Sequence, residues 1–178
     1  MGDEAPEFTL PDSRGRQVSL TTMLRAGPAI VTFYRGGWCP YCNIQLRAYQ
    51  RALPEIVALG GRIIAISPQL PDGSLSVAEK NALEFDVLSD AGNVVGRSFG
   101  LVYGLPEELR AAMRLNDKPL PGINGDESWE LPLPATFVIA QDRRVALAYV
   151  DVDYRHRLAP EDIVATLRLL AAATAPSA

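Results

Sequence analysis

The chain has 178 residues, of which 21 are acidic and 17 are lysine or arginine, so its net charge is −4. This length suits a single domain over residues 1–178 with a sizeable core. The acidic balance, with no long basic run, argues against nucleic acid and anionic membranes as partners. The N-terminal residues lack the basic and apolar regions of a signal peptide, and no segment is long and apolar enough to cross a bilayer. We therefore expect a cytoplasmic protein.

The first third of the chain has the pattern of an α/β fold. Residues 8–10 and 17–20 flank a turn-rich stretch and predict an N-terminal β-hairpin. Residues 29–34 and 62–67 are apolar and rich in β-branched side chains, which favours two buried strands. Between them, apolar residues recur at helical spacing from Pro40 onward, and a proline suits the first turn of a helix. A strand, a helix and a strand in this order predict a parallel pair.

Prolines and polar residues set the next boundaries. Pro54 is expected to kink or interrupt the long helix, because it lacks the N–H that a helix interior needs. Residues 76–79 resemble a capping box and predict a second helix through residue 83. A short strand over 85–88 and a helix over 93–99 follow.

Residues 101–132 do not continue this pattern and are predicted to be an inserted segment. A weak helix is expected over 106–115. Residues 116–126 are rich in Asn, Asp, Pro and Gly, which predicts a loop. Loops of this length in compact domains are often functional or mobile.

The last third completes the fold. Residues 136–140 and 145–150 predict an antiparallel hairpin, Pro160 begins a final amphipathic helix, and residues 174–178 are expected to fray. This order predicts an α/β thioredoxin-like fold, with a central mixed β-sheet flanked by helices. The N-terminal hairpin and the segment at about 101–132 are additions to it.

The two cysteines of the chain, Cys39 and Cys42, form a C-x-x-C pair between the first buried strand and the long helix. Cys39 falls at the helix N-terminus, where free N–H groups and the helix dipole favour a thiolate, the reactive form of cysteine. Cys42 lies about one turn later and can close a disulfide with it. In a cytoplasmic protein such a pair is catalytic or metal-binding rather than structural, and we favour redox chemistry over two inert buried thiols. A zinc site needs about four ligands, and His156 is the one histidine, so no metal is expected.

Four segments of the chain carry a family resemblance: residues 5–12, 33–40, 88–90 and 134–139. In this order and spacing they resemble the alkyl hydroperoxide reductase/thiol-specific antioxidant family, in its peroxiredoxin-like branch, from about residue 3 to 170. The resemblance implies a thiol-dependent peroxidase. The centre itself resembles two other groups of the thioredoxin superfamily, since Pro40 and Tyr41 match glutaredoxins and Trp38 matches thioredoxins.

The cysteine site departs from the peroxiredoxin pattern P-x-x-x-T/S-x-x-C. Thr32 stands where that pattern has proline, and Gly36 stands where it has the hydroxyl that orients the peroxide. Pro134 stands where the family keeps a helper arginine. A proline there resembles thioredoxins and glutaredoxins, which implies a cis peptide bond before Pro134 and a place against the cysteines. The buried acid of thioredoxins would fall at Phe33, so no carboxylate is expected to move a proton for Cys42.

Other residues near the cysteine pair have a possible functional role and a simpler structural one. Arg35 is a candidate for lowering the thiolate pKa or orienting a peroxide, with an ordinary surface arginine as the alternative. Trp38 is expected to shield the sulfur or dock a partner, with packing as the alternative. Trp129 covers the pocket or belongs to the core. Residues 155–157 are interpreted as a solvated polar segment, and His156 is not expected to act as a base.

The leading hypothesis is an antioxidant oxidoreductase in which Cys39 reduces a hydroperoxide and Cys42 resolves the product to a disulfide. A thioredoxin-like or small-thiol donor would recycle it. The alternatives are a thiol–disulfide oxidoreductase acting on protein or glutathione disulfides, and a redox-sensing or binding module. No flavin, nucleotide or other cofactor is expected, because the phosphate-binding glycine motifs are absent. A homodimer is suggested only by its frequency in the family.

Overall fold

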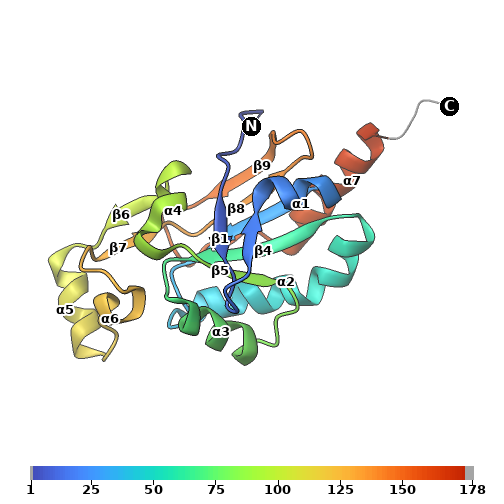
Figure 1. The fold of residues 1–178 in the computed structure, drawn as a ribbon. Helices are drawn as coiled ribbons and strands as arrows, with labels where there is room; N and C mark the ends of the chain where they lie inside the picture. Colours follow the sequence, from blue (N-terminus) through green and yellow to red (C-terminus); the bar gives the residue numbers. More distant parts are fainter. Residues whose placement is uncertain (1, 175–178) are drawn as a thin grey trace.

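The computed structural model describes residues 2–174 (Figure 1). The tail predicted to fray lies outside this range, apart from its first residue. The centre is a five-stranded mixed sheet, ordered β5-β4-β3-β8-β9. Its strands are β3 (Ala29–Phe33), β4 (Arg62–Ser67), β5 (Asp86–Ser89), β8 (Ala135–Ile139) and β9 (Val145–Val150). β3, β4 and β5 are parallel, while β8 runs antiparallel to β3 and to β9. This sheet and its flanking helices confirm the predicted thioredoxin-like fold.

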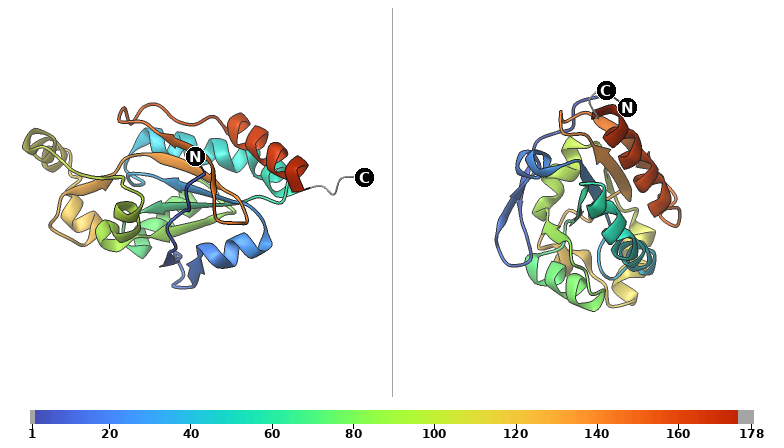
Figure 2. Two further views of the ribbon diagram at one scale, coloured as in Figure 1. Left: turned by 90° about the horizontal axis from the view of Figure 1, so that it is seen from above. Right: turned by 90° about the vertical axis from the view of Figure 1, so that its right-hand side faces the viewer.

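Helices cover both faces of the sheet (Figure 2). The helices outside the inserted segment are α1 (Leu20–Ala26), α2 (Pro40–Ala58), α3 (Pro71–Lys80), α4 (Val94–Ser98), which follows a 3-10 turn at Ala91–Asn93, and α7 (Pro160–Thr174). The predicted N-terminal hairpin is present as β1 (Thr9–Pro11) and β2 (Gln17–Ser19). No helix in the described range is long and apolar enough to cross a membrane.

The strands separate two apolar cores because successive side chains point to opposite faces. Ile30 and Ile63 point to the face covered by α2 and α7, where the core also contains both cysteines. Val31 and Ile64 point to the other face, which is covered by α1 and the hairpin. Since both faces are covered, β3 and β8 are buried along their whole length. Their sequences are accordingly continuous apolar runs rather than alternating ones.

Two helix predictions differ from the structure. α2 continues through Pro54, so the expectation of an interruption there is wrong, while a kink at Pro54 stays a prediction. Pro54 lies on the exposed side of the helix, where water can satisfy the carbonyl that loses its partner. α3 begins at Pro71, five residues before the predicted capping box, because a proline fits the first helical position.

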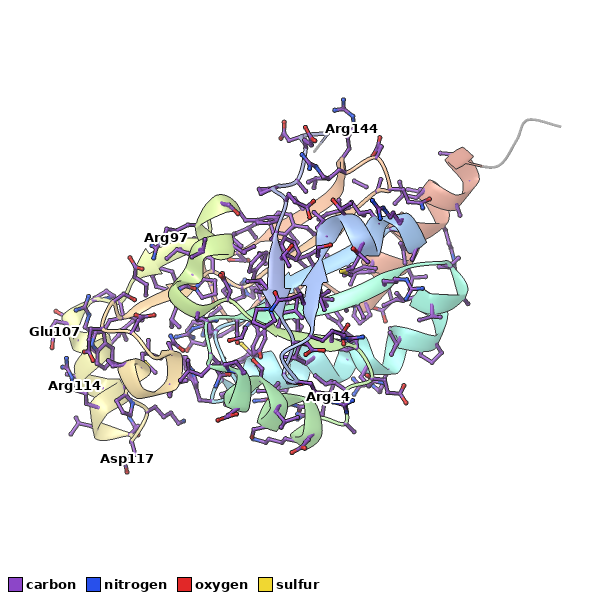
Figure 3. The ribbon with its side chains drawn as sticks, viewed as in Figure 1. Arg14, Arg97, Glu107, Arg114, Asp117 and Arg144 are labelled. Carbon is purple, nitrogen blue, oxygen red and sulfur yellow. The ribbon has the colours of Figure 1, made fainter. Side chains whose placement is uncertain are left out.

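The inserted segment forms a small unit at one end of the molecule (Figure 1). It consists of β6 (Val102–Gly104) paired with β7 (Glu130–Pro132), and of α5 (Glu107–Leu115) and α6 (Leu120–Asn124). α5 confirms the weak helix, whereas α6 lies inside the predicted loop. α5 has no buried residue, and its outer face carries the ion pair between Arg114 and Glu107, at 2.8 Å (Figure 3).

A small apolar cluster attaches the inserted segment to the rest of the protein. It consists of Leu105, Leu120, Trp129 and Leu131, and the half-buried Trp38 of the cysteine loop packs against it. The segment that sequence analysis could not assign a role therefore lies beside the cysteine site.

Candidate active site

The cysteine pair lies at the carboxyl end of β3, where the chain turns into α2. Cys39 is the N-cap of α2, and Pro40 is its first residue. The backbone N–H of Cys39 donates to the carbonyl of Gly36 at 3.1 Å, which fixes the turn. Both cysteines are free thiols and buried, Cys39 at 2% exposure and Cys42 at 0%.

The two thiols have opposite acidities. The Cys42 side chain donates a hydrogen bond to Cys39, and this lowers the pKa of Cys39 to about 6 against the effect of burial. The backbone N–H of Cys42 and the charges of Arg35 and Arg157 act in the same direction. The same hydrogen bond, together with burial, raises the pKa of Cys42 well above its ordinary value. At neutral pH this arrangement favours a Cys39 thiolate and a neutral Cys42 thiol.

Buried amide side chains hold the loop before Cys39. The N–H of Gly37 donates to Oε1 of Gln69 at 2.6 Å. Nδ2 of Asn43 donates to the carbonyls of Gly37 and Cys39, at 2.8 and 3.0 Å. Nδ2 of Asn81 in turn donates to Oδ1 of Asn43 at 2.8 Å. These residues could not be predicted from the sequence, because single amides at distant positions form no local pattern.

Arg35 is not an ordinary surface arginine. Its guanidinium lies over the rings of Trp38 and Tyr154, at 4.9 and 4.4 Å from their centres, and the residue is 8% exposed. Tyr154 also contacts the ring of Tyr41 edge-on at 5.7 Å. The negative electrostatic potential over an aromatic face stabilises a guanidinium placed there. The rings of Trp38 and Tyr154 therefore cover the Arg35 guanidinium beside the thiols.

The backbone conformation and surroundings of position 36 explain why glycine replaces the hydroxyl residue of the family there. Its φ of +146° is a backbone conformation that other residues rarely adopt. A Cβ at this position would overlap the indole Nε1 of Trp38. The space that a Thr or Ser side chain would need is therefore filled by the Trp38 ring.

The expectation of a cis bond before Pro134 is wrong, since residues 2–174 contain no cis peptide bond. Pro134 is buried and follows Leu133, whose N–H donates to the carbonyl of Leu101 at 2.8 Å. The chain runs extended from β7 into β8 here, and a trans bond keeps that direction. Pro134 precedes Ala135, and Ala135 pairs with Phe33. Pro134 therefore lies at the end of the sheet where β3 leads into the cysteine loop.

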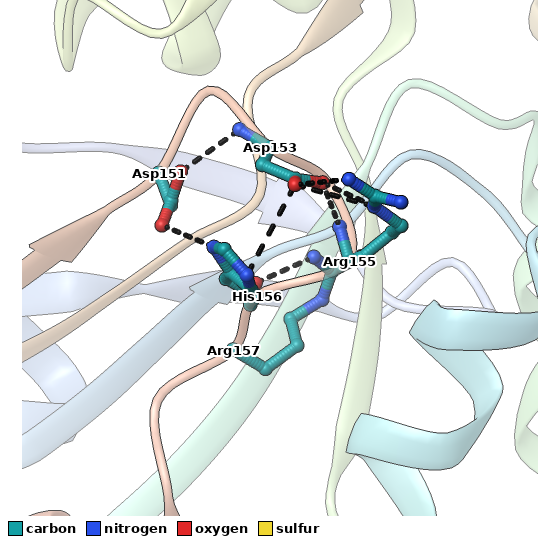
Figure 4. Close-up of polar contacts among 5 residues, drawn as sticks. All are labelled: Asp151, Asp153, Arg155, His156 and Arg157. Atoms are coloured by element: carbon teal, nitrogen blue, oxygen red, sulfur yellow. Dashed lines mark hydrogen bonds and ion pairs between the residues drawn. The ribbon is translucent and has the colours of Figure 1, made fainter.

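The segment at 155–157 is solvated only in part (Figure 4). Arg155 is paired with Asp153 at 2.7 Å, and Nδ1 of His156 contacts Asp151 at 3.0 Å, both at the surface. Arg157 is half-buried instead, and its Nη2 donates to Sγ of Cys42 at 3.6 Å. The interpretation as a solvated segment holds for the first two residues and is wrong for Arg157.

Trp129 belongs to the small cluster of the inserted segment, with the guanidinium of Arg114 over its ring at 4.6 Å. It contacts the site through Trp38 rather than through the cysteines. In the described part of the chain, no three side chains of the metal-binding types gather into a metal site.

Comparison with known proteins places the chain in a family. A model of the AhpC/TSA family matches residues 1–148. The chain belongs to the AhpC/TSA family. It is 35% identical to peroxiredoxin Bcp of Escherichia coli and 34% identical to the chloroplastic peroxiredoxin Q of Gentiana triflora, each over 100 residues. These alignments cover 56% of this chain, 64% of the bacterial relative and 46% of the plant relative.

Among solved structures, peroxidoxin BcpB of Mycobacterium tuberculosis superposes with a TM-score of 0.75 at 25% identity, covering 95% of this chain and 96% of the other. The resemblance to peroxiredoxins is therefore confirmed for the family and the fold. The alignments with the two sequence relatives cover less than two thirds of each relative's length.

Proposed function

We propose that this protein is a thiol-dependent peroxidase whose two cysteines perform successive steps. The proposal rests on one observation, that two free, buried thiols lie one turn apart at the N-terminus of α2, in a chain whose relatives are named peroxiredoxins. The Cys39 thiolate attacks a hydroperoxide, so that an S–O bond forms and the O–O bond breaks. The alkoxide or hydroxide that leaves takes a proton from water, and Cys39 becomes a sulfenic acid.

In the second step Cys42 attacks the sulfenic sulfur, and the products are a Cys39–Cys42 disulfide and water. An external thiol then reduces this disulfide by exchange. A thioredoxin-like protein or a small thiol, such as those that keep the cytoplasm reducing, would supply it. No bound cofactor takes part in this cycle. In it Arg35 balances the Cys39 thiolate, while Trp38, Tyr41 and Pro134 line the site and Pro40 begins the helix.

A thiol–disulfide oxidoreductase is the second candidate, because Gly36 leaves the site without the peroxide-orienting hydroxyl. Burial argues against it. Cys39 is 2% exposed, so a disulfide carried by a folded protein reaches it only if Trp38 and its neighbours move. Hydrogen peroxide is small enough to need little rearrangement. The peroxidase is therefore the first choice.

Stopped-flow oxidation of the reduced protein at about pH 8, above the lowered pKa of Cys39, tests the proposal. Hydrogen peroxide should oxidise Cys39 at least about 100-fold faster than a free thiol, the range that one positioned catalytic group provides. Cys39→Ser should abolish the reaction. Cys42→Ser should react once and stop at a sulfenic acid that dimedone traps.

Reduction of insulin and of a mixed glutathione disulfide provides the comparison. Peroxide oxidation no faster than that of free cysteine, together with rapid disulfide reduction, would transfer the proposal to the second candidate. Slow reaction in every assay would leave a redox-sensing module.

A further inference from the structure

Arg157 differs from the charged residues around it. Asp151, Asp153, Arg155 and His156 satisfy one another at the surface, as the contacts in Figure 4 show. Arg157 makes no ion pair with a carboxylate among the described residues. Its Nη1 donates instead to the carbonyl of His156 at 2.8 Å.

The opposite edge of this guanidinium faces Cys42. Nη2 lies 3.6 Å from the Cys42 sulfur, and Nε is buried without an acceptor. A half-buried cation whose Nε has no acceptor and which has no acid partner is costly unless something else supplies negative charge. A thiolate at Cys42 would supply that charge at contact distance.

Cys42 needs such help at one point of the cycle. In the reduced protein the negative charge belongs to Cys39, and Cys42 is the donor. Once Cys39 is a sulfenic acid, Cys42 must become the nucleophile, yet it is fully buried. No carboxylate within residues 2–174 contacts either thiol, and Phe33 occupies the position where thioredoxins keep their buried acid.

We propose that Arg157 is a catalytic residue of the resolving step, in which its guanidinium stabilises the thiolate of Cys42 as it attacks Sγ of Cys39. The new S–S bond forms as the S–O bond of the sulfenic acid breaks. The departing oxygen takes up the proton lost by Cys42 and leaves as water, so no further oxidant or reductant is needed. The inference rests on the proposed function only for the origin of the sulfenic acid.

Four groups face Cys42 and can influence its ionisation. Cys39 lies at the start of the same helix, and its negative charge opposes a thiolate at Cys42. The Tyr34 hydroxyl lies at the end of β3, and the charge of a Cys42 thiolate contributes to raising its pKa. The backbone N–H of Arg35 and the guanidinium of Arg157 favour the thiolate. Of these, Arg157 is the one that a substitution removes without altering the cysteine loop.

Two-phase stopped-flow kinetics test this role, with Trp38 as the fluorescent reporter beside Cys39. In Arg157→Gln at about pH 8, the peroxide-dependent phase should change by no more than roughly twofold, since Cys39 is already ionised. The peroxide-independent phase, which forms the disulfide, should slow at least about tenfold, the equivalent of one pKa unit. Its pH midpoint should rise, and Arg157→Lys should recover part of the rate. Arg155→Gln removes a neighbouring guanidinium that does not touch sulfur and should leave both phases unchanged.

Mass spectrometry gives a second readout. A sulfenic acid that is resolved slowly remains available to a second peroxide, so Arg157→Gln should accumulate sulfinic acid at Cys39 under excess peroxide. A merely structural role for Arg157 would slow both phases together.

The disulfide reagent DTNB separates this inference from the proposed function. Attack by Cys39 releases one thionitrobenzoate, and attack by Cys42 on the mixed disulfide releases the second. In Arg157→Gln only the second release should slow, whichever oxidant the protein meets in the cell. An unchanged second release, or an unchanged resolving phase with peroxide, would overturn the role of Arg157, even if the wild type proves to be a peroxidase.

Discussion

At the scale of single residues, the departures of this site from the peroxiredoxin pattern depend on one another. Gly36 lacks a side chain, and the indole of Trp38 occupies the space this leaves. The guanidinium of Arg35 lies over that indole ring. The glycine that replaces the family's hydroxyl residue therefore makes room for Trp38 and Arg35, which together cover the site. Restoring the family's residue at position 36 alone would displace the cover rather than improve the site.

Gly36→Ala should lower the free energy of unfolding by about 2–5 kcal/mol, because it combines a strained φ with displacement of a packed ring. Gly100→Ala is the matched control, since Gly100 has a φ of +70° but nothing within 4 Å of a new Cβ. It should lose only about 1–2 kcal/mol. Urea unfolding measures both. Equal losses in the two variants would show that Trp38 moves aside freely and that the cover is not rigid.

At the scale of secondary structure, the sequence was informative where burial or a terminal proline acts locally. β3 and β4 are continuous apolar runs, and α2 begins at a proline, so the unit that carries the cysteines could be predicted. α6 could not, because Pro119, Pro121 and Gly122 are typical of a loop. What holds α6 is the burial of Leu120 against Trp129, a contact between distant residues.

The site was predictable to the same extent. Cys39 and Cys42 are separated by only two residues and form a motif with its own chemistry. Arg157 follows two surface residues and lies 115 positions from Cys42, so no local pattern marks it. The cis bond before Pro134 was inferred by analogy with thioredoxins, but here β7 leads directly into β8 and the chain stays extended.

The inserted segment should stabilise the cysteine loop through its apolar cluster. Leu120→Ala should cost about 2–4 kcal/mol in unfolding free energy, because the side chain is 1% exposed. It should also speed alkylation of Cys39 by iodoacetamide, since Trp38 loses part of its support. Leu115→Ala, on the same segment but 85% exposed, should change stability by less than about 0.5 kcal/mol and leave alkylation unchanged. If Leu120→Ala weakens the fold but alkylation stays slow, the segment does not support the site.

At the scale of the whole molecule, the sheet divides the protein into two cores with different consequences for the chemistry. The core under α2 and α7 contains both cysteines and continues into the ring of Tyr49. The core under α1 and the hairpin contains neither cysteine. Protein interiors pack densely, so a cavity in the core under α2 and α7 should displace the thiols. A cavity in the core under α1 and the hairpin is separated from the thiols by the sheet.

Two leucines, both 0% exposed, test this division. Leu46 lies one turn beyond Cys42 in α2, and Leu20 begins α1 on the opposite face. Leu46→Ala and Leu20→Ala should each lower the free energy of unfolding by about 2–5 kcal/mol, because each removes a buried side chain of the same size. Only Leu46→Ala should slow the reaction of Cys39 with peroxide, by about tenfold or more, since small displacements of reacting groups are costly. Leu20→Ala should stay within roughly twofold of the wild type. Equal kinetic losses in the two variants, measured where both are fully folded, would mean that the sheet transmits packing defects to the site and that the two cores act as one.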